Sequence, residues 1–268
     1  LGAAQLANGN APGARRLFDR SLEEPAAVRD RNAELIGTLA NQALVTEQPA
    51  ERAALFGQAR EALTRLLGAN HRKAIDVRYQ AALFIEHPRR VAAELREVCS
   101  IYQRYHSTIA HDTIDFCVFE LGWLAEEHGD LAEARDAMAR VRGKTGPLGA
   151  AAAAYLAMLD GKLDEAVMMA RAVGEKFQTT TWARFHVADA ILFAALCLDR
   201  LQRRDAAVAS ARASLAILEQ LTFLASTPYY QRRLARNRAL LARLGSPTDA
   251  KQFAALAAAW YRKVGGYD

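Results

Sequence analysis

A six-residue segment that recurs along the chain constrains the fold more than any other feature of the sequence. The segment GDLAEA at 129–134 recurs as GKLDEA at 161–166, as GNAPGA at 9–14 and, more loosely, as QRRDAA at 202–207. Three of the four copies begin with glycine, which readily adopts the left-handed conformation that ends many helices. Asp or Asn follows the glycine in two copies and favours the start of a new helix. The sequence therefore predicts a helix-to-helix turn at each copy.

Residues at fixed distances from these turns predict how the flanking helices pack. Gly122 lies seven residues before Gly129, and Met138 and Val141 lie four and seven residues after Ala134. These spacings keep the residues on one helix face, and a small residue lets two antiparallel helices approach closely. The corresponding residues at the other turns are Gly2, Phe18 and Ser21; Ala154, Ala170 and Val173; and Ala195, Ala211 and Ser214. The sequence thus predicts a repeated array of helical hairpins.

Composition agrees with an all-α chain. Hydrophobic residues make up 51% of the sequence, and the runs of Val, Ile and Thr that build strands are missing. No apolar segment approaches the roughly 20 residues that cross a bilayer, so we expect no membrane partner. Cys99, Cys117 and Cys197 are widely spaced, with no CxxC pair. We interpret them as small core residues with free thiols, which predicts a reducing compartment and a cytoplasmic location.

The repeat resembles the tetratricopeptide repeat (TPR), a family of helical-hairpin arrays. The residues that match its signature are Leu121, Gly122, Gly129, Leu131, Ala134, Met138 and Val141, with Pro147 near the family's final proline. The resemblance implies a right-handed superhelical solenoid of antiparallel helix pairs. The segment LGANH at 67–71 is similar to a loop signature of kinesin-light-chain-like members. Bacterial arrays of this composition often accompany a Ser/Thr kinase or ATPase domain, so the resemblance also implies a larger signalling protein.

The predicted organisation has two parts. Residues 1–226 form the TPR-like array, which includes hairpins with irregular turns at 33–67 and 74–105. Its first unit is truncated at the N-terminus, because the sequence opens without methionine and partway through a helical pattern. Residues 227–268 form C-terminal capping helices at 229–244 and 247–264. Ser246 is the expected N-cap of the last helix, and Gly265 and Gly266 are its expected stop.

The sequence does not favour catalysis. It contains no GxSxG, P-loop or GxGxxG motif and no Cys/His nucleophile arrangement. His106 and His111 form an HxxxxH pair in a connection, which is not a metal-ligand spacing on a helix. Glu126 and Glu127 are adjacent, so their carboxylates point about 100° apart on a helix. We expect no enzymatic activity of this segment, no cofactor and no metal.

The resemblance implies that the first helix of each hairpin lines an inner, concave groove for an extended peptide or a helix. Aromatic residues beside acids in this set favour a protein or peptide partner with apolar anchors and basic flanks. The family's carboxylate clamp does not appear at these positions. Packing between neighbouring hairpins is an equally strong interpretation of the aromatic residues. The inner-face candidates are Asn41, Asp76, Tyr79, Glu86, Phe119, Trp123, Glu126, Ala151, Tyr155 and Met158.

The net charge of +5 is concentrated near the C-terminus, where residues 199–243 contain nine arginines and three acids. The helix expected at 228–243 carries a candidate basic patch of Arg232, Arg233, Arg236 and Arg243. Such a patch could follow phosphates or bind an acidic partner. We favour a solvated face of a terminal cap instead, because repeat arrays need a polar end. Nucleic acid is therefore not the expected partner.

Taken together, these features predict a non-catalytic protein-interaction or regulatory scaffold within a larger signalling protein, with a protein or peptide segment bound in the groove. One alternative is a peptide-sensing receptor domain that controls a separate effector domain. The other is nucleic-acid binding through the basic C-terminal helix. The sequence leaves the partner's identity and the oligomeric state open.

Overall fold

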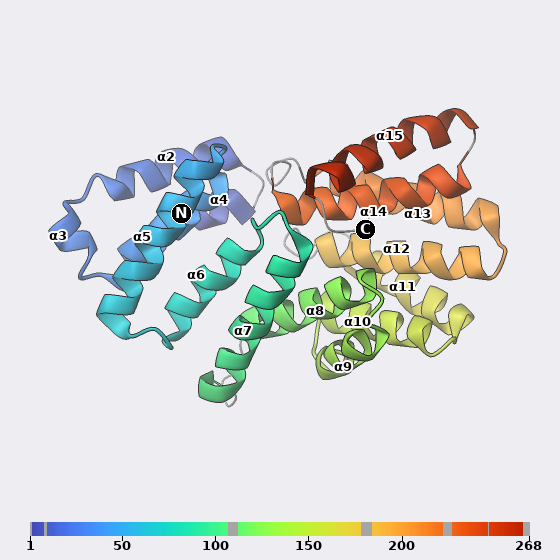
Figure 1. The fold of residues 1–268 in the computed structure, drawn as a ribbon, viewed down its shortest axis with the longest axis horizontal. Helices are drawn as coiled ribbons and strands as arrows, with labels where there is room; N and C mark the ends of the chain where they lie inside the picture. The colour runs from blue at the N-terminus through green and yellow to red at the C-terminus, as the bar shows by residue number, and fades with distance from the viewer. Residues whose placement is uncertain are drawn as a thin grey trace. The chain divides into compact units, whose positions relative to one another are not determined.

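The structure is a computed structural model that describes residues 2–7, 10–106, 112–177, 184–221, 227–245 and 247–264. The regular structure in these ranges is entirely helical (Figure 1), which confirms the all-α prediction. The helices are α1 (Gly2–Ala7), α2 (Ala11–Leu22), α3 (Ala26–Arg29), α4 (Ala33–Val45), α5 (Pro49–Leu67), α6 (Arg72–Ala82), α7 (Pro88–His106), α8 (Asp112–Glu127), α9 (Leu131–Val141), α10 (Pro147–Leu159), α11 (Leu163–Phe177), α12 (Arg184–Arg200), α13 (Arg204–Glu219), α14 (Pro228–Leu244) and α15 (Pro247–Val264).

Helices that follow one another in the chain pack side by side. Close contacts join α4 to α5, α10 to α11, α12 to α13 and α14 to α15, and further contacts join successive pairs, as between α11 and α12. Short connections between such neighbours make each pair antiparallel. Hairpins that meet in this way bury apolar faces against one another, as the units of a repeat array do.

The predicted turns share one backbone geometry. The amide of Asp130 donates to the carbonyl of Ala125 at 2.8 Å, and the same six-residue bond recurs at 2.9 Å from Lys162, Arg203 and Asn10 to Ala157, Leu198 and Gln5. A bond of this span satisfies a carbonyl at the end of the first helix. The turn prediction is confirmed at all four copies by these bonds, although Gly9 itself lies outside the described residues.

The first residue of the turn has a positive φ in the three copies where it is described: 81° at Gly129, 76° at Gly161 and 59° at Gln202. Gln202 is the one non-glycine with positive φ among the described residues. An L-residue with a side chain pays about 1–2 kcal/mol in this conformation. The repeat therefore imposes its backbone even where the sequence lacks the glycine that suits it.

The small residues before the turns allow the close helix contacts that their spacing predicts. A Cβ atom on Gly122 would lie 3.0 Å from both Ala137 Cβ and Met138 Cε. A Cβ atom on Gly2 would lie 2.4 Å from the ring of Phe18. Each glycine thus faces the second helix of its own hairpin, so the predicted packing of the first helix on the second is confirmed at both sites.

The chain separates into two compact units. Unit 1 comprises Leu1–Ile85 and Ala93–Cys117, and unit 2 comprises Glu86–Ala92 and Val118–Asp268. The core of unit 1 includes Ile36, Leu39, Phe56 and Leu63. Helices α14 and α15 belong to the same unit as α9–α13, so contacts do not set them apart as a separate cap. The predicted boundary between the repeat array and the capping helices, between residues 226 and 227, stays a prediction.

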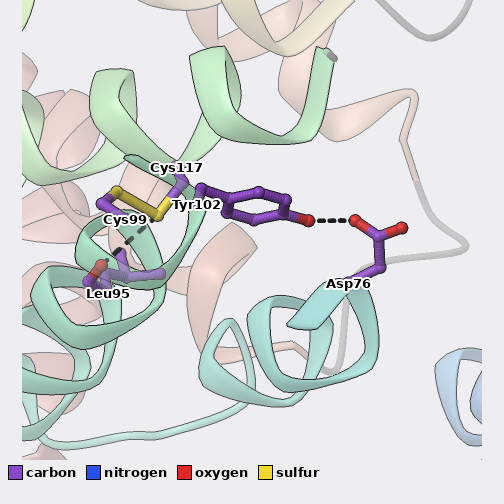
Figure 2. The surroundings of a disulfide bond; sticks show 5 residues. All are labelled: Asp76, Leu95, Cys99, Tyr102 and Cys117. Carbon is purple, nitrogen blue, oxygen red and sulfur yellow. Dashed lines mark hydrogen bonds between the residues drawn. A yellow bond between two sulfur atoms is a disulfide. The ribbon is translucent and has the colours of Figure 1, made fainter. Parts of the chain in front are cut away.

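The prediction that the three cysteines lie in the core is confirmed, but the expectation of free thiols is wrong for Cys99 and Cys117. Cys99 and Cys117 form a disulfide bond across 18 residues of sequence, with Cα atoms 6.2 Å apart, and both residues are buried. The bond joins α7 to the first turns of α8, and the Cys117 sulfur lies 3.4 Å from the carbonyl oxygen of Leu95 (Figure 2). The pairing depends on how two successive helices cross, which residue spacing does not determine. Cys197 is free and buried, as predicted, and burial raises the pKa of its thiol to about 11.

Within the described part of the chain, no helix combines the length and the apolar character that a membrane span requires.

Candidate functional site

Two of the predicted inner-face residues meet in an open hollow of unit 1. Asn41 on α4 and Asp76 on α6 both line this hollow, which has a volume of about 170 Å³. A second hollow of about 510 Å³ between α1, α2 and α4 shares Glu34 and Asn41 with the first. The two hollows therefore lie next to each other along α4, and together they are called the inner-face groove. The other residues that line its first hollow are Ala33, Gly37, Ala40, Leu63, Lys73, Val77 and Gln80.

A glycine forms part of the floor of the inner-face groove. Gly37 lies in the middle of α4, and a Cβ atom built on it would have no atom within 4 Å. Glycine in a helix interior costs about 0.5–1 kcal/mol relative to alanine. Since no neighbour crowds this position, close packing does not explain the glycine. The missing side chain leaves space in the groove.

Charged and hydroxyl groups fix the polar lining of the groove. Glu34 and Lys73 form an ion pair, and the hydrogen bond from Lys73 lowers the pKa of Glu34. The Tyr102 hydroxyl donates a hydrogen bond to Asp76 (Figure 2). Burial, followed by this hydrogen bond, raises the pKa of Tyr102 far above its usual range. Tyr102 therefore stays a neutral donor that orients the Asp76 carboxylate.

The other two candidates from α6 and its surroundings do not line this hollow. Tyr79 follows Asp76 by one helical turn and is half-buried. Glu86 belongs to unit 2, where its carboxylate accepts a hydrogen bond from Lys263 Nζ at 2.7 Å. The structure thus brings Asn41 and Asp76 to one hollow, whereas the other predicted inner-face residues lie elsewhere.

The predicted aromatic residues of unit 2 are buried within that unit. Phe119, Trp123 and Tyr155 have no exposed surface, and Met158 is 1% exposed. The Phe119 ring meets the ring of His186 edge-on at 5.0 Å, and Tyr155 lies 4.6 Å from Phe193 between ring centroids. This burial favours the packing interpretation that the sequence left open. Ala151, on the same helix as Tyr155, is also fully buried.

Helix α14 supplies an arginine to this aromatic cluster. The Arg233 guanidinium lies 5.0 Å from the Trp123 ring centroid and 4.0 Å from that of Tyr229. It donates hydrogen bonds to Asp189 at 3.0 Å from Nε and to Glu120 at 2.6 Å from Nη2. All three charged side chains are at most 2% exposed. A buried charge requires such partners, because desolvation alone costs several kcal/mol.

Burial also shifts the titration of the groups around Arg233. It raises the pKa of Asp189 to about 6, although the charge of Arg233 acts in the opposite direction. It lowers the pKa of His186 to about 3, and here Arg233 adds to the shift. His186 is therefore neutral at pH 7, while the carboxylate of Asp189 is mostly ionised and can pair with Arg233.

A second arginine of α14 makes a similar contact. Arg236 forms an ion pair with Glu126 of α8, and its guanidinium lies 4.9 Å from the Trp123 ring centroid. The predicted groove residues Trp123 and Glu126 thus contact two residues of the predicted basic patch. Trp123 and Glu126 of α8 are therefore covered by α14.

The favoured interpretation of the basic helix is therefore wrong. Arg233 is fully buried and Arg232 is 2% exposed, so α14 is not a solvated cap. Arg243 differs from these two, because its side chain is 59% exposed and pairs with Asp199 at 2.7 Å. The four predicted arginines therefore do not form one exposed patch. The buried acids that hold α14 were missed by the sequence reasoning. The sequence signal that could have found them is an acidic residue at a position where the helical period predicts a buried apolar one, as at Glu120 and Asp189.

The histidine pair gives no site in the described residues. His106 Nε2 lies 2.8 Å from the carbonyl oxygen of Asn70, which is a structural contact between the end of α7 and the connection before α6. His111 lies outside the described residues. The groove of unit 1 offers amide, carboxylate and ammonium groups beside apolar ones, which is the chemistry of binding a polypeptide segment.

Comparisons with known proteins address the fold. No family model matches the sequence, and no curated protein matches it. One solved structure that does match is a Signal Transduction ATPase with Numerous Domains (STAND) protein with a tetratricopeptide repeat sensor from Pyrococcus horikoshii. The identity is 12%, the TM-score is 0.53, and the match covers 98% of this chain and 41% of that one. The chain has a TPR-like fold.

This TPR-like array spans less than half the length of the matching structure. The fold agrees with the resemblance that the repeat signature carries, from Leu121 to Val141. The finer assignment to the kinesin-light-chain-like variety stays a prediction.

Proposed function

We propose that the chain is a non-catalytic protein-interaction and regulatory module of a larger signalling protein, and that its inner-face groove in unit 1 binds an extended segment of a protein partner. The observation that carries the proposal is the shared hollow of Asn41 and Asp76. Both residues are inner-face positions that the resemblance to the tetratricopeptide repeat implies, and both line an open hollow. The matching STAND protein has a TPR sensor, which supports a role in sensing or interaction.

The lining of the groove indicates the kind of segment. Asn41 and Gln80 carry amides that both donate and accept hydrogen bonds, and such groups can pair with an extended backbone. Glu34 and Asp76 carry negative charge and Lys73 and Arg20 carry positive charge, so the lining is balanced, which favours a polar segment of low net charge. The apolar Val77 and Leu63 also line the hollow, so a small apolar side chain of the segment would contact them.

Unit 2 supports the proposal in a different way. Its α8 candidates are held by Arg233 and Arg236, so a partner that used Trp123 would have to replace α14. A buried ion pair loses several kcal/mol when one partner is removed. We therefore assign peptide binding to the groove of unit 1 and structural packing to Phe119, Trp123 and Tyr155. Nucleic acid is disfavoured as a partner for the same reason, because these arginines already pair with acids.

The sensing alternative rests on the match to the STAND protein with its TPR sensor. A sensor that controls a separate effector domain should compact when a short peptide binds, whereas a scaffold should change little. Small-angle scattering with and without a bound peptide separates the two roles.

The disulfide bears on the proposed location. Disulfide bonds are rare in the reducing cytosol and persist in oxidising compartments. A cytoplasmic location, which the sequence predicts, therefore requires that Cys99 and Cys117 are reduced in the cell. We keep this location as a proposal for the reduced form of the chain. Alkylation of thiols in a native cell extract measures that form directly.

Selection of peptides tests the proposed function. Random twelve-residue peptides displayed on phage would be selected on the immobilised chain, and single clones would be measured against variants. We expect selected peptides to lose at least tenfold in affinity for Gly37→Leu, which fills the groove, and for Asp76→Ala. For peptides that lose affinity for Asp76→Ala, Gly57→Leu is the matched control, because Gly57 lies outside the inner-face groove and is also mid-helix with no atom within 4 Å of a built Cβ. A selection in which every peptide binds Gly37→Leu as well as the wild type would refute the proposal.

A further inference from the structure

Unit 1 contains a second cleft that none of the predicted site residues lines. It lies between α5, α6 and the segment that leads into α7, and has a volume of about 390 Å³. This size falls within the roughly 300–1,000 Å³ range of ligand pockets. The cleft shares only Val77 with the first hollow of the inner-face groove, so the two are separate sites. It is called the α5–α6 cleft below.

The walls of the α5–α6 cleft are aromatic and apolar. Phe56 and Phe84 approach with ring centroids 5.5 Å apart, and the Arg52 guanidinium lies 4.4 Å from the Phe84 ring centroid. Arg52 is 5% exposed and donates from Nε to the carbonyl of Thr46 at 2.9 Å, which fixes its position in the wall. The rings and the guanidinium face thus form a rigid surface for an apolar side chain.

The floor of this cleft is open at Gly57. A Cβ atom built on Gly57 would have no atom within 4 Å, although the residue lies in the middle of α5. A glycine there costs helix stability without relieving any clash. The space above Gly57 can accept an apolar side chain from another molecule.

The cleft is lined by three arginines, Arg52, Arg60 and Arg78, and by one carboxylate, Glu94. Arg78 is already held by Glu94 and Glu97, with Nη1 donating to Glu97 at 2.9 Å. Arg60, in contrast, is exposed and has no hydrogen bond or ion pair within the described part of the chain. A cation at the edge of an apolar cleft complements a carboxylate that lies next to an apolar side chain.

We propose that the α5–α6 cleft binds an acidic segment of a partner protein that carries a large apolar side chain. The apolar side chain occupies the space over Gly57, against the paired rings of Phe56 and Phe84, and a neighbouring carboxylate pairs with Arg60. This site goes beyond the inner-face groove and would give the module a second point of attachment. Two linked contacts raise the overall affinity through the effective concentration of the second.

Fluorescence anisotropy with a defined probe tests the inference on the full chain. The probe is a fluorescein-labelled peptide of sequence Glu-Glu-Phe-Leu-Glu-Glu, and its controls replace either the four acids by lysine or the two apolar residues by serine. We expect the probe to bind and both control peptides to bind at least tenfold more weakly. Absence of probe binding, or equal binding of the lysine peptide, would overturn the inference.

Variants locate the probe. Gly57→Leu and Arg60→Glu should each weaken binding at least tenfold, Arg60→Lys should retain most of it, and Gly37→Leu should leave it unchanged. Circular dichroism of each variant checks that the helices are intact. If Gly37→Leu abolishes binding and Gly57→Leu does not, the probe occupies the inner-face groove. That result would overturn the α5–α6 site and support the proposed function, so the two proposals can fail separately.

Discussion

Arg233 of α14 donates a hydrogen bond to Glu120 of α8 at 2.6 Å, across 113 residues of sequence, and both side chains are buried. The same guanidinium binds Asp189 of α12. Three helices of unit 2 are therefore tied together by one cation and two anions. The contact explains why the aromatic residues of α8, which could have lined a binding groove, are packed instead.

Removal of the Arg233 charge should destabilise the fold strongly. Arg233→Met leaves Glu120 and Asp189 buried without their cation, and breaking a buried pair in this way typically costs about 3–5 kcal/mol. Urea unfolding followed by circular dichroism measures the loss. Arg243→Met is the matched control, since its pair with Asp199 is exposed and worth about 0–1 kcal/mol. Equal losses in the free energy of unfolding for the two variants would show that the buried ion pairs of Arg233 contribute no more to stability than the ion pair of Arg243.

Acidification should destabilise the chain below neutral pH through His186. Its pKa is lowered by burial to about 3, so the unfolded chain binds a proton between about pH 6.5 and 3 that the folded chain does not. Stability is therefore lost as the pH falls through this window. Asp189, with its pKa raised to about 6, acts oppositely between about pH 6 and 4, but its shift is smaller. His186→Phe keeps the ring contact with Phe119 and should reduce the loss of stability between pH 6.5 and 4. An unchanged pH profile would contradict this assignment.

The strained turn offers a stabilising substitution. Gln202 has a φ of 59° at the position where the other described turns have glycine. Gln202→Gly should raise the free energy of unfolding by about 1 kcal/mol, because glycine adopts this conformation without steric cost. Gly129→Ala, the reverse change at the equivalent turn, should lower it by a similar amount. Thermal unfolding of both variants checks the sign, and a loss of stability in Gln202→Gly would show that the side chain contributes more than its backbone costs.

The disulfide should stabilise unit 1 measurably. A bond that closes 18 residues restricts the unfolded chain, and loops of about this length correspond to about 3 kcal/mol. The double variant Cys99→Ala/Cys117→Ala should therefore unfold at lower urea than the wild type. Thiol titration of the denatured chain should find one free thiol, from Cys197, before reduction and three afterwards. Three thiols without reduction would show that Cys99 and Cys117 are not bonded.

Local order was largely predictable from the sequence, and long-range contacts were not. The expected helices at 229–244 and 247–264 correspond to α14 and α15 within one residue, because proline and the helical period define their ends. The repeat alone predicts that Gln202 occupies the same turn position as Gly129 and Gly161. The positive φ of Gln202 confirms this prediction. The predicted N-cap at Ser246 and the stop at Gly265 and Gly266 lie outside the described residues.

The contacts that decide the candidate site depend on tertiary structure. The resemblance to the tetratricopeptide repeat implies inner-face positions for Asn41 and Asp76, and the structure brings them to one hollow. Nothing in the spacing shows that α14 lies against α8, since the pairing of Arg236 with Glu126 spans 110 residues. The cysteine pair was missed for a similar reason, because helix crossing sets the distance between Cys99 and Cys117.

Hydrogen exchange measured by mass spectrometry tests the central claim most directly. The full chain would be compared with and without a saturating amount of a peptide from the phage selection. The account predicts slower exchange in α4 and α6, around Asn41 and Asp76, and no change in α8 or α14. Slower exchange in α8 with faster exchange in α14 would contradict it, because the peptide would then have replaced α14 at Trp123.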